Sequence, residues 1–295
     1  MSILLGTDAT AGLNASALGL EFATIPAGTY DVGDAEYQNN PPRQVAIDRF
    51  ELAKTPTDNT QLANALRALG NQNTVLMFES VQDRRWTIAA RGTREEINQI
   101  ERPTLMEIIS QLKPSEENQF AQVGELAVDG ALQAFDLGSA AVRVVPVTLE
   151  HHLLEKFNGD NQPALMNYDE TAAIAALFGL IMATEEMWEV ASGDLRDQRY
   201  KKEKELRKVA HLHPADRTAD VGKKEANWFG FHDMLGNVWE WVANRANPKS
   251  NNRGLRGGSW CIFPEDVRAA LRGDGRPAGW GIGIGSRFGR QDSQG

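Results

Sequence analysis

The chain has almost no cysteine, few histidines and no long apolar run, and each shortage excludes a class of protein. Cys261 is the only cysteine among 295 residues, which excludes an intrachain disulfide framework and a zinc site built from thiolates. The longest apolar stretch, Ala172–Ala183, is about half of what a bilayer crossing needs. The first residues carry no basic segment of a secretory signal. The sequence therefore predicts neither a signal peptide nor a transmembrane segment, and it leaves the location unknown.

Charge is distributed unevenly along an otherwise ordinary composition. Hydrophobic residues make up 41% of the chain and charged residues 24%, which is typical of a folded protein of one or two domains. Residues 251–295 hold 11 of the 27 glycines and seven arginines against four acidic residues, a net charge of +3. Because the whole chain carries −9, the other 250 residues carry −12, which argues against a nucleic-acid partner. A basic, glycine-rich end on an acidic chain requires an explanation.

Short strands and helices alternate along the chain. Asn167 and Glu170 have the spacing of a capping box and open a helix that ends at Gly179, while Thr184 opens a second helix. Pro103 restarts a helix within a largely helical stretch from 60 to 112. From residue 228 to residue 290 the pattern indicates a compact, loop-rich β region. Alternating or β-branched segments predict strands at Phe22–Ile25, Thr29–Val32, Val45–Phe50, Thr74–Phe78 and Val142–Val147.

Two sets of side chains suggest a metal site. The pairs His151-His152 and His211-x-His213 lack the helical spacing and third ligand of a zinc site, so we expect solvated surface histidines. Asp233 and Glu240 flank a Gly-Asn turn and have the oxygen ligands that Ca²⁺ prefers. A turn capped by Asp233 explains the same residues equally well. No other cofactor is predicted.

The arginines of the C-terminal region have two interpretations. Arg256, Arg268, Arg272 and Arg287 lie among glycines and aromatic residues, where planar guanidinium groups brace loop carbonyls or stack on tryptophan. The alternative, an anion-binding patch, fits the acidic chain less well. The alternating glycines from 279 to 285 lack the strand, lysine and helix of a phosphate-binding loop.

Taken together, several segments resemble the formylglycine-generating-enzyme-type domain, a variant of the C-type lectin fold. The most specific strings are Asn227-x-x-Gly-x-x-Asp-Met-x-Gly-Asn-Val-Trp-Glu-Trp241 and Arg256-Gly-Gly-Ser-Trp260. The resemblance covers roughly residues 21–55 and 160–290. It implies an α+β, loop-rich C-type lectin-like fold of the formylglycine-generating (sulfatase-modifying factor) type. Its expected parts are an N-terminal extension over 1–20, the domain over 21–290, an insertion at about 60–160 and a C-terminal variable region at about 255–290.

Catalysis is not expected on this fold. Oxidase members of the family bind copper through a cysteine pair shortly after Gly-Gly-Ser, and here Cys261 stands alone. A single thiolate gives no two-sulfur Cu(I) site. Ergothioneine-type sulfoxide synthases add an iron-binding histidine domain, which this sequence does not match. The resemblance therefore implies a protein that is not an enzyme.

The C-terminal region is similar instead to that of variable proteins from diversity-generating retroelements. In these proteins a fixed frame is interrupted by positions whose asparagine codons mutate at adenines. The frame is visible as Arg256-Gly-Gly-Ser-Trp260, Pro264–Ala270, Arg272, Arg276–Ala278 and Ile284–Arg287. Apart from Trp280, every residue between the frame segments can arise from an AAC codon. The resemblance implies exchangeable ligand-binding residues at Cys261, Ile262, Phe263, Leu271, Gly273, Asp274, Gly275, Trp280, Gly281, Ile282 and Gly283.

The expected function is non-enzymatic ligand or receptor binding through this diversified surface on a rigid scaffold. The resemblance implies a protein or glycan ligand on a cell surface and a location in a phage virion or the cytoplasm. Phe263 and Trp280 are the expected energetic centres, since aromatic residues dominate interface energies. Two alternatives stay open: a divergent formylglycine-generating-type oxidase and a structural virion component.

Overall fold

The computed structural model describes residues 3–80, 86–100, 133–136, 141–152, 157, 159–193, 202–247 and 250–291. The chain divides into two compact units. The first comprises Met1–Ala17, Ala65–Glu150 and Ala172–Gly179, and the second comprises Leu18–Asn64, His151–Thr171 and Leu180–Gly295. Most of the interval 60–160 thus belongs to the first unit, while the predicted domain limits stay predictions. In the part of the chain that is described, no helix is long and apolar enough to span a bilayer.

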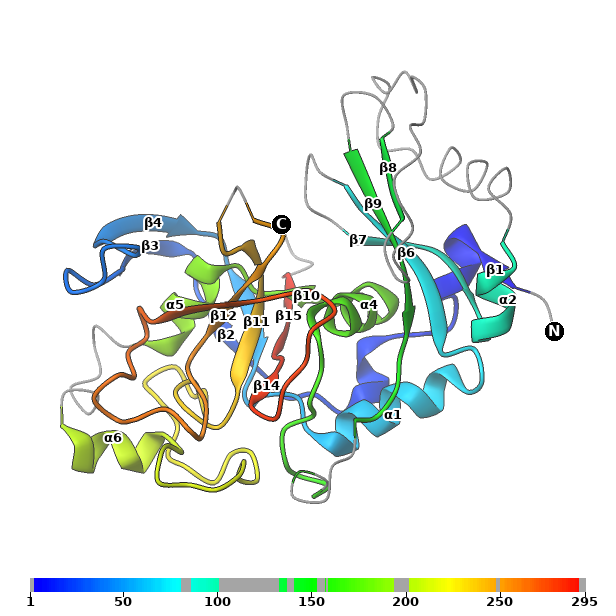
Figure 1. The fold of residues 1–295 in the computed structure, drawn as a ribbon. Helices are drawn as coiled ribbons and strands as arrows, with labels where there is room; N and C mark the ends of the chain where they lie inside the picture. Colours follow the sequence, from blue (N-terminus) through cyan, green and yellow to red (C-terminus); the bar gives the residue numbers. More distant parts are fainter. Residues whose placement is uncertain are drawn as a thin grey trace. The chain divides into compact units, whose positions relative to one another are not determined.

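The first unit is built on one five-stranded sheet with the order β1-β7-β6-β9-β8, in which every neighbouring pair is antiparallel (Figure 1). The helix α2 packs on it, and Thr93 and Glu96 form a capping box at its start. The predicted strands at Thr74–Phe78 and Val142–Val147 are confirmed. The elements are β1 (Leu4–Leu5), the 3₁₀ helix η1 (Gly6–Thr10), β6 (Thr74–Ser80), β7 (Trp86–Gly92), α2 (Arg94–Asn98), β8 (Gln133–Asp136) and β9 (Ala141–Thr148).

Two helices are divided between the units: the first turn of each belongs to the second unit and the last turn to the first unit. They are α1 (Asn59–Leu69) and α4 (Tyr168–Phe178). The predicted capping box of α4 is confirmed: Asn167 Oδ1 accepts from the Glu170 N–H and Glu170 Oε2 from the Asn167 N–H, both at 2.8 Å. The helix restart expected at Pro103 lies outside the described residues.

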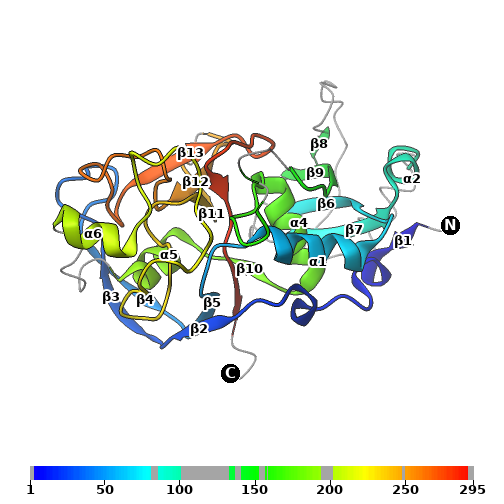
Figure 2. The ribbon, with the colours of Figure 1, turned by 90° about the horizontal axis from the view of Figure 1, so that it is seen from below.

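The second unit contains three small sheets. Their strand orders are β10-β15-β5-β2, β13-β12-β11-β14 and β3-β4 (Figure 2). The predicted strand Phe22–Ile25 is confirmed as β2. The elements are the 3₁₀ helix η2 (Ala15–Leu18, which begins in the first unit), β2 (Phe22–Ile25), β3 (Gly28–Val32), β4 (Arg43–Ile47), β5 (Phe50–Ala53), β10 (Ile181–Met182), α5 (Glu185–Ser192), α6 (Glu203–Val209), β11 (Trp239–Arg245), β12 (Arg253–Arg256), β13 (Arg272–Gly275), β14 (Ile284–Gly285) and β15 (Phe288–Gln291).

The helix α5 organises the core of the second unit. It packs against the hairpin β3–β4 and against β11 and β12. Thr184 caps it, as predicted, by accepting from the Met187 N–H at 3.1 Å. Trp188 is fully buried among Val242, Phe231 and Met234. The same helix therefore supplies an apolar face to the core and an acidic face to the arginines described next.

Candidate ligand-binding surface

Arg287 is one of three fully buried arginines of the C-terminal region, together with Arg253 and Arg256. Its guanidinium donates to both carboxylate oxygens of Glu240 at 2.7–3.1 Å, and each side chain is only 1% exposed. It also donates to the carbonyls of Ala53 and His232, each at 2.8 Å. The Trp188 indole completes the site by donating to Glu240 Oε2 at 2.7 Å. Arg287 thus ties β5, β11 and the segment before β15 together.

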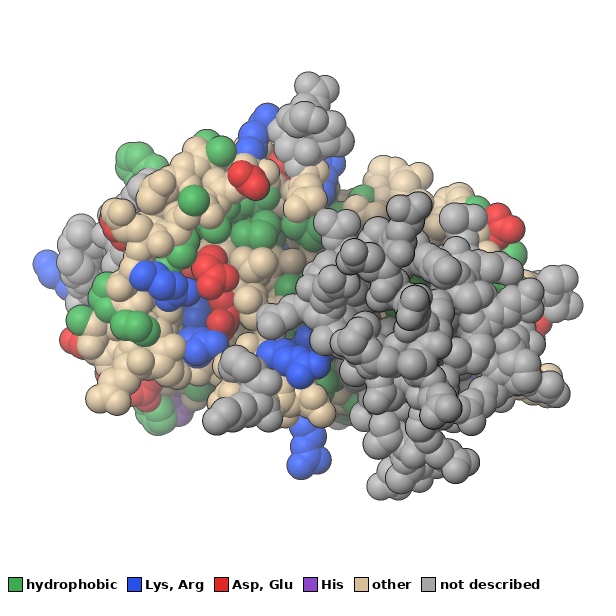
Figure 3. Space-filling view, turned by 90° about the horizontal axis from the view of Figure 1, so that it is seen from above, with side chains coloured by type: hydrophobic (Ala, Val, Ile, Leu, Met, Phe, Trp, Pro, Cys, Tyr) green, Lys and Arg blue, Asp and Glu red, His purple; other side chains and the backbone are tan. Residues whose placement is uncertain are grey.

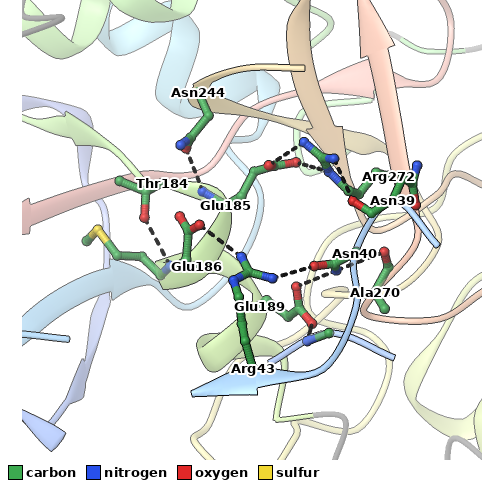
Figure 4. Close-up of polar contacts among 12 residues, drawn as sticks. Asn39, Asn40, Arg43, Thr184, Glu185, Glu186, Glu189, Asn244, Ala270 and Arg272 are labelled. Atoms are coloured by element: carbon green, nitrogen blue, oxygen red, sulfur yellow. Dashed lines mark hydrogen bonds and ion pairs between the residues drawn. The ribbon is translucent and has the colours of Figure 1, made fainter. Parts of the chain in front are cut away.

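Two further arginines bind the acidic face of α5. Arg256 donates to Glu189 at 2.5 Å and to the Ala269 carbonyl at 2.6 Å. Arg272 forms a bidentate pair with Glu185 at 2.7 and 2.8 Å (Figure 4). Burial lowers the pKa of Arg256, and the charges of Glu189 and Glu185 oppose that shift. These contacts fix the ends of the loop between β12 and β13.

The same network extends to the loop after β3. Asn40 donates to Glu189 at 2.9 Å and to the Ala270 carbonyl at 3.2 Å (Figure 4). Arg43 pairs with Glu186 at 3.0 Å nearer the surface. Figure 3 shows basic and acidic side chains next to one another on this unit.

The predicted bracing role is therefore confirmed for Arg256, Arg272 and Arg287, and it accounts for their charge better than an anion patch does. Arg268 differs, because its guanidinium donates to the carbonyl of the adjacent Val267. Sequence reasoning missed the carboxylates that receive these arginines. The available signal was the i, i+4 spacing of Glu185 and Glu189, which places both on one face of α5.

Exposed apolar side chains gather at the predicted exchangeable positions. The described residues include five exposed large hydrophobic residues, and three of them are Phe263, Trp280 and Ile282, at 44–48% exposure. The other two are Leu5 and Trp228. Three of the predicted exchangeable positions therefore carry large apolar side chains that are partly open to solvent.

The histidine prediction is wrong for the residues beside this surface. His152 is partly buried, and its Nε2 atom is hydrogen-bonded to Glu170 at 2.7 Å. Its ring stacks on Trp280, with the ring centroids 5.0 Å apart. His213 contacts the Phe263 ring at 4.2 Å. The spacing of the histidines along the sequence does not show that Trp280 and Phe263, from distant loops, pack against them. Among the described residues, no group of three or more His, Cys, Asp or Glu side chains is arranged to hold a metal.

Steric contacts divide the exchangeable positions into open and closed ones. A Cβ atom at Gly275 would lie 2.6 Å from the ring of buried Trp241, and one at Gly283 would lie 3.1 Å from Ser259. A Cβ at Gly273 would lie 3.1 Å from Trp239, whereas one at Gly281 would meet only Ile284, at 3.5 Å. A contact below 3.0 Å, as at Gly275, forces the neighbour to move, and a contact of 3.0–3.4 Å, as at Gly273 and Gly283, requires the neighbour to give by a few tenths of an ångström. We therefore count these three positions as closed.

Two further positions, Ile262 and Leu271, are intermediate: both are partly buried, and Ile262 packs against the core. We call the remaining predicted positions the open set. Its members are exposed, or in the case of Gly281 sterically free: Cys261, Phe263, Asp274, Trp280, Gly281 and Ile282.

The carboxylates of Asp233 and Glu240, the predicted calcium ligands, already have hydrogen-bond partners within the protein. Both oxygens of Glu240 accept from Arg287, and a cation beside that guanidinium would be repelled. Asp233 accepts from the Gly222 N–H at 2.7 Å, and its burial raises the pKa of the carboxyl. Asp233 and Asn237 both have positive φ, 55° and 57°, as residues of a tight turn do. The turn interpretation accounts for these residues.

Cys261 lies in an exposed loop, as a member of the open set should. Its sulfur is 3.3 Å from the Ser259 hydroxyl. A second cysteine is absent from the whole sequence, so the donor set for two-thiolate copper binding is incomplete.

Comparison with known proteins agrees with the fold. Over 121 residues the chain is 31% identical to the serine/threonine-protein kinase pkn1 of Chlamydia caviae, a match covering 35% of this chain. The chain spans about a fifth of the length of that relative, since 20% of it is covered.

Two solved structures are similar in fold. PvdO from Pseudomonas aeruginosa is 19% identical with a TM-score of 0.55, and Treponema denticola variable protein 1 is 16% identical with a TM-score of 0.56. In both comparisons the match covers 92% of this chain and 95% of the other.

The family model described as the sulfatase-modifying factor enzyme 1-like domain matches residues 11–291, nearly the whole chain. Together with the mixed helices and small sheets, this confirms the predicted α+β fold of the C-type lectin-like, formylglycine-generating type. The chain belongs to the family of the sulfatase-modifying factor enzyme 1-like domain.

Proposed function

We propose that this protein binds a ligand, without catalysing a reaction, through the open set of its C-terminal region. The observation that carries the proposal is the exposure of Phe263, Trp280 and Ile282, at positions that the resemblance predicts to be exchangeable. A few large side chains, tryptophan prominent among them, supply most of the binding energy of protein interfaces.

The scaffold beneath the open set supports this role. Arg256 and Arg272 fasten the segment between β12 and β13 to α5, and Arg287 fastens the segment before β15 to Glu240. A loop held by buried charge-assisted bonds keeps its backbone while its outward side chains change. Rigid loops also lose less conformational entropy on binding, which favours affinity.

We further propose that variation at the open set is generated by a retroelement. The name of the structure from Treponema denticola, variable protein 1, agrees with this idea. The DNA around codons 250–295 tests it: a nearby template repeat should differ from the gene only at adenines. A locus with neither a template nor a reverse transcriptase gene would remove this part of the proposal. The ligand we expect is a protein or glycan on a cell surface, reached from a phage particle or a cell.

A display experiment tests binding through the open set directly. Randomising its six positions on yeast should yield clones that bind immobilised lysozyme or mannan. A matched control library randomises six exposed positions elsewhere in the second unit: Lys202, Glu203, Lys204, Lys208, Asp216 and Arg217. We expect enrichment only from the first library. Equal enrichment from both libraries, or none from the first, would contradict the proposal.

An oxidase is the enzymatic alternative, and we expect it to fail a direct assay. The purified protein, incubated with Cu(I), oxygen and a cysteine peptide, should form no aldehyde, because Cys261 has no partner thiolate. Trapping with hydroxylamine and mass spectrometry measures the product. Aldehyde that forms with the wild type and disappears with Cys261→Ala would establish catalysis instead.

A further inference from the structure

We infer that His152 is a positioning residue for Trp280, so that a fixed segment far from the C-terminal region forms part of the binding surface. Trp280 belongs to the open set, whereas His152 lies 128 positions earlier and outside every predicted exchangeable block. The inference rests on the proposed function for its purpose. The geometric relation between the two rings is independent of it.

The first turn of α4 holds the loop that carries Trp280. The N–H groups of Tyr168 and Asp169 donate to the Pro277 carbonyl at 3.0 and 3.3 Å. Such N–H groups have no partner within the helix, and they attract a carbonyl oxygen. A turn follows, closed by a 2.9 Å bond from the Gly279 N–H to the Arg276 carbonyl. The backbone just before Trp280 is therefore anchored.

The same helix end fixes the imidazole of His152. Glu170 uses one carboxylate oxygen in the capping box and the other to bond His152 Nε2 at 2.7 Å. The Glu170 side chain is only 5% exposed and that of His152 14%, so water competes little for this bond. Because a capping box holds the carboxylate at both the helix and the chain before it, the imidazole has a fixed attachment point.

Trp280 then stacks on this fixed ring. The two planes are inclined by 14°, with centroids 5.0 Å apart. The indole nevertheless stays 44% exposed, so the stack covers part of the ring and leaves the rest to a ligand. Holding a flexible side chain in one rotamer before binding reduces the conformational entropy that is lost when a ligand binds.

This arrangement defines which side chains position 280 can use best. The flat imidazole of His152 can stack on any planar side chain at position 280. Tryptophan, tyrosine, phenylalanine, histidine and arginine at this position should therefore all be ordered by stacking on His152. Aliphatic residues at 280 gain no stacking. His152, which lies outside the predicted exchangeable positions, therefore favours planar side chains at position 280.

Fluorine NMR of the full chain labelled with 5-fluorotryptophan tests the inference without any ligand. The chain has seven tryptophans, and the resonance of Trp280 is assigned by its loss in Trp280→Phe. The two variants compared are His152→Phe, which keeps a ring to stack on, and His152→Leu, which fills similar space without one. The readouts are the chemical shift of that resonance and its change between H₂O and D₂O.

We expect His152→Leu to raise the solvent isotope effect on the Trp280 resonance about twofold, since the stacked ring is 44% exposed and an unstacked ring samples all its rotamers. His152→Phe keeps a ring but loses the bond to Glu170, so it should raise the effect less than His152→Leu does. The other six resonances should not move in either variant. An unchanged Trp280 resonance in His152→Leu, or equal changes in both variants, would overturn the inference.

A thermal melt checks that each variant is folded. Should His152→Leu not fold, His152→Gln keeps a hydrogen bond to Glu170 and lacks a ring, so it must expose Trp280 in the same way. Because this experiment contains no ligand, its failure leaves the display experiment standing. Failure of the display experiment likewise leaves the stacking result standing.

Discussion

Arg287→Ala is expected to lower the free energy of unfolding by about 3–5 kcal/mol, the cost of leaving one member of a buried ion pair alone. Glu240 would keep its charge with 1% of its side chain exposed and with only the Trp188 indole to bond it. The carbonyls of Ala53 and His232 would lose their donors as well. Urea denaturation followed by circular dichroism measures the change.

A matched control lies three residues further along the chain. Arg290 pairs with Glu51 on the surface, where its side chain is 49% exposed. Its hydrogen bond holds the pKa of Glu51 below the usual value, but such exposed pairs contribute about 1 kcal/mol or less to stability. Arg290→Ala should therefore leave the unfolding curve nearly unchanged. Equal losses in the two variants would mean that burial does not set the strength of the Arg287 site.

The elements near Asn167 and Thr184 could be predicted from the sequence because their signals are local. A capping box needs only four residues in a row, and the structure forms it at Glu170 as expected. The strand Phe22–Ile25 follows from β-branched and aromatic residues between two breaks. The exposure of Phe263 and Trp280 agrees with the prediction from the frame motifs, which separate residues that the fold requires from residues predicted to be exchangeable.

The partners of the arginines could not be predicted because they are distant along the chain. Glu185 and Arg272 are separated by 87 residues, and the local sequence around either residue does not indicate that the two pair. Their pairing explains the uneven charge. Acidic residues on α5 and β11 accept the arginines of the C-terminal region, so the two charge excesses partly cancel inside the fold. The skew records folding contacts and indicates nothing about a ligand's charge.

The space around each glycine is a second feature that could not be predicted from the sequence. The resemblance places Gly275 and Gly281 in the same class, because both lie between frame segments and glycine can arise from an AAC codon. Their surroundings differ, since one faces the Trp241 ring and the other faces the end of the flexible Ile284 side chain. Steric room depends on a residue from another strand, and spacing along one strand does not report it.

Gly275→Val is accordingly expected to lower the free energy of unfolding by about 2–3 kcal/mol, in the range found for overpacked cores. The new Cβ would lie 2.6 Å from the Trp241 ring, whose indole is held by a 2.9 Å bond to the Met166 carbonyl. Gly281→Val makes the same chemical change where the nearest atom is 3.5 Å away, and it should cost less than about 1 kcal/mol. Urea denaturation compares the two. If both variants are equally stable, Trp241 yields to new side chains, position 275 returns to the exchangeable surface, and the open set is larger than its contacts indicate.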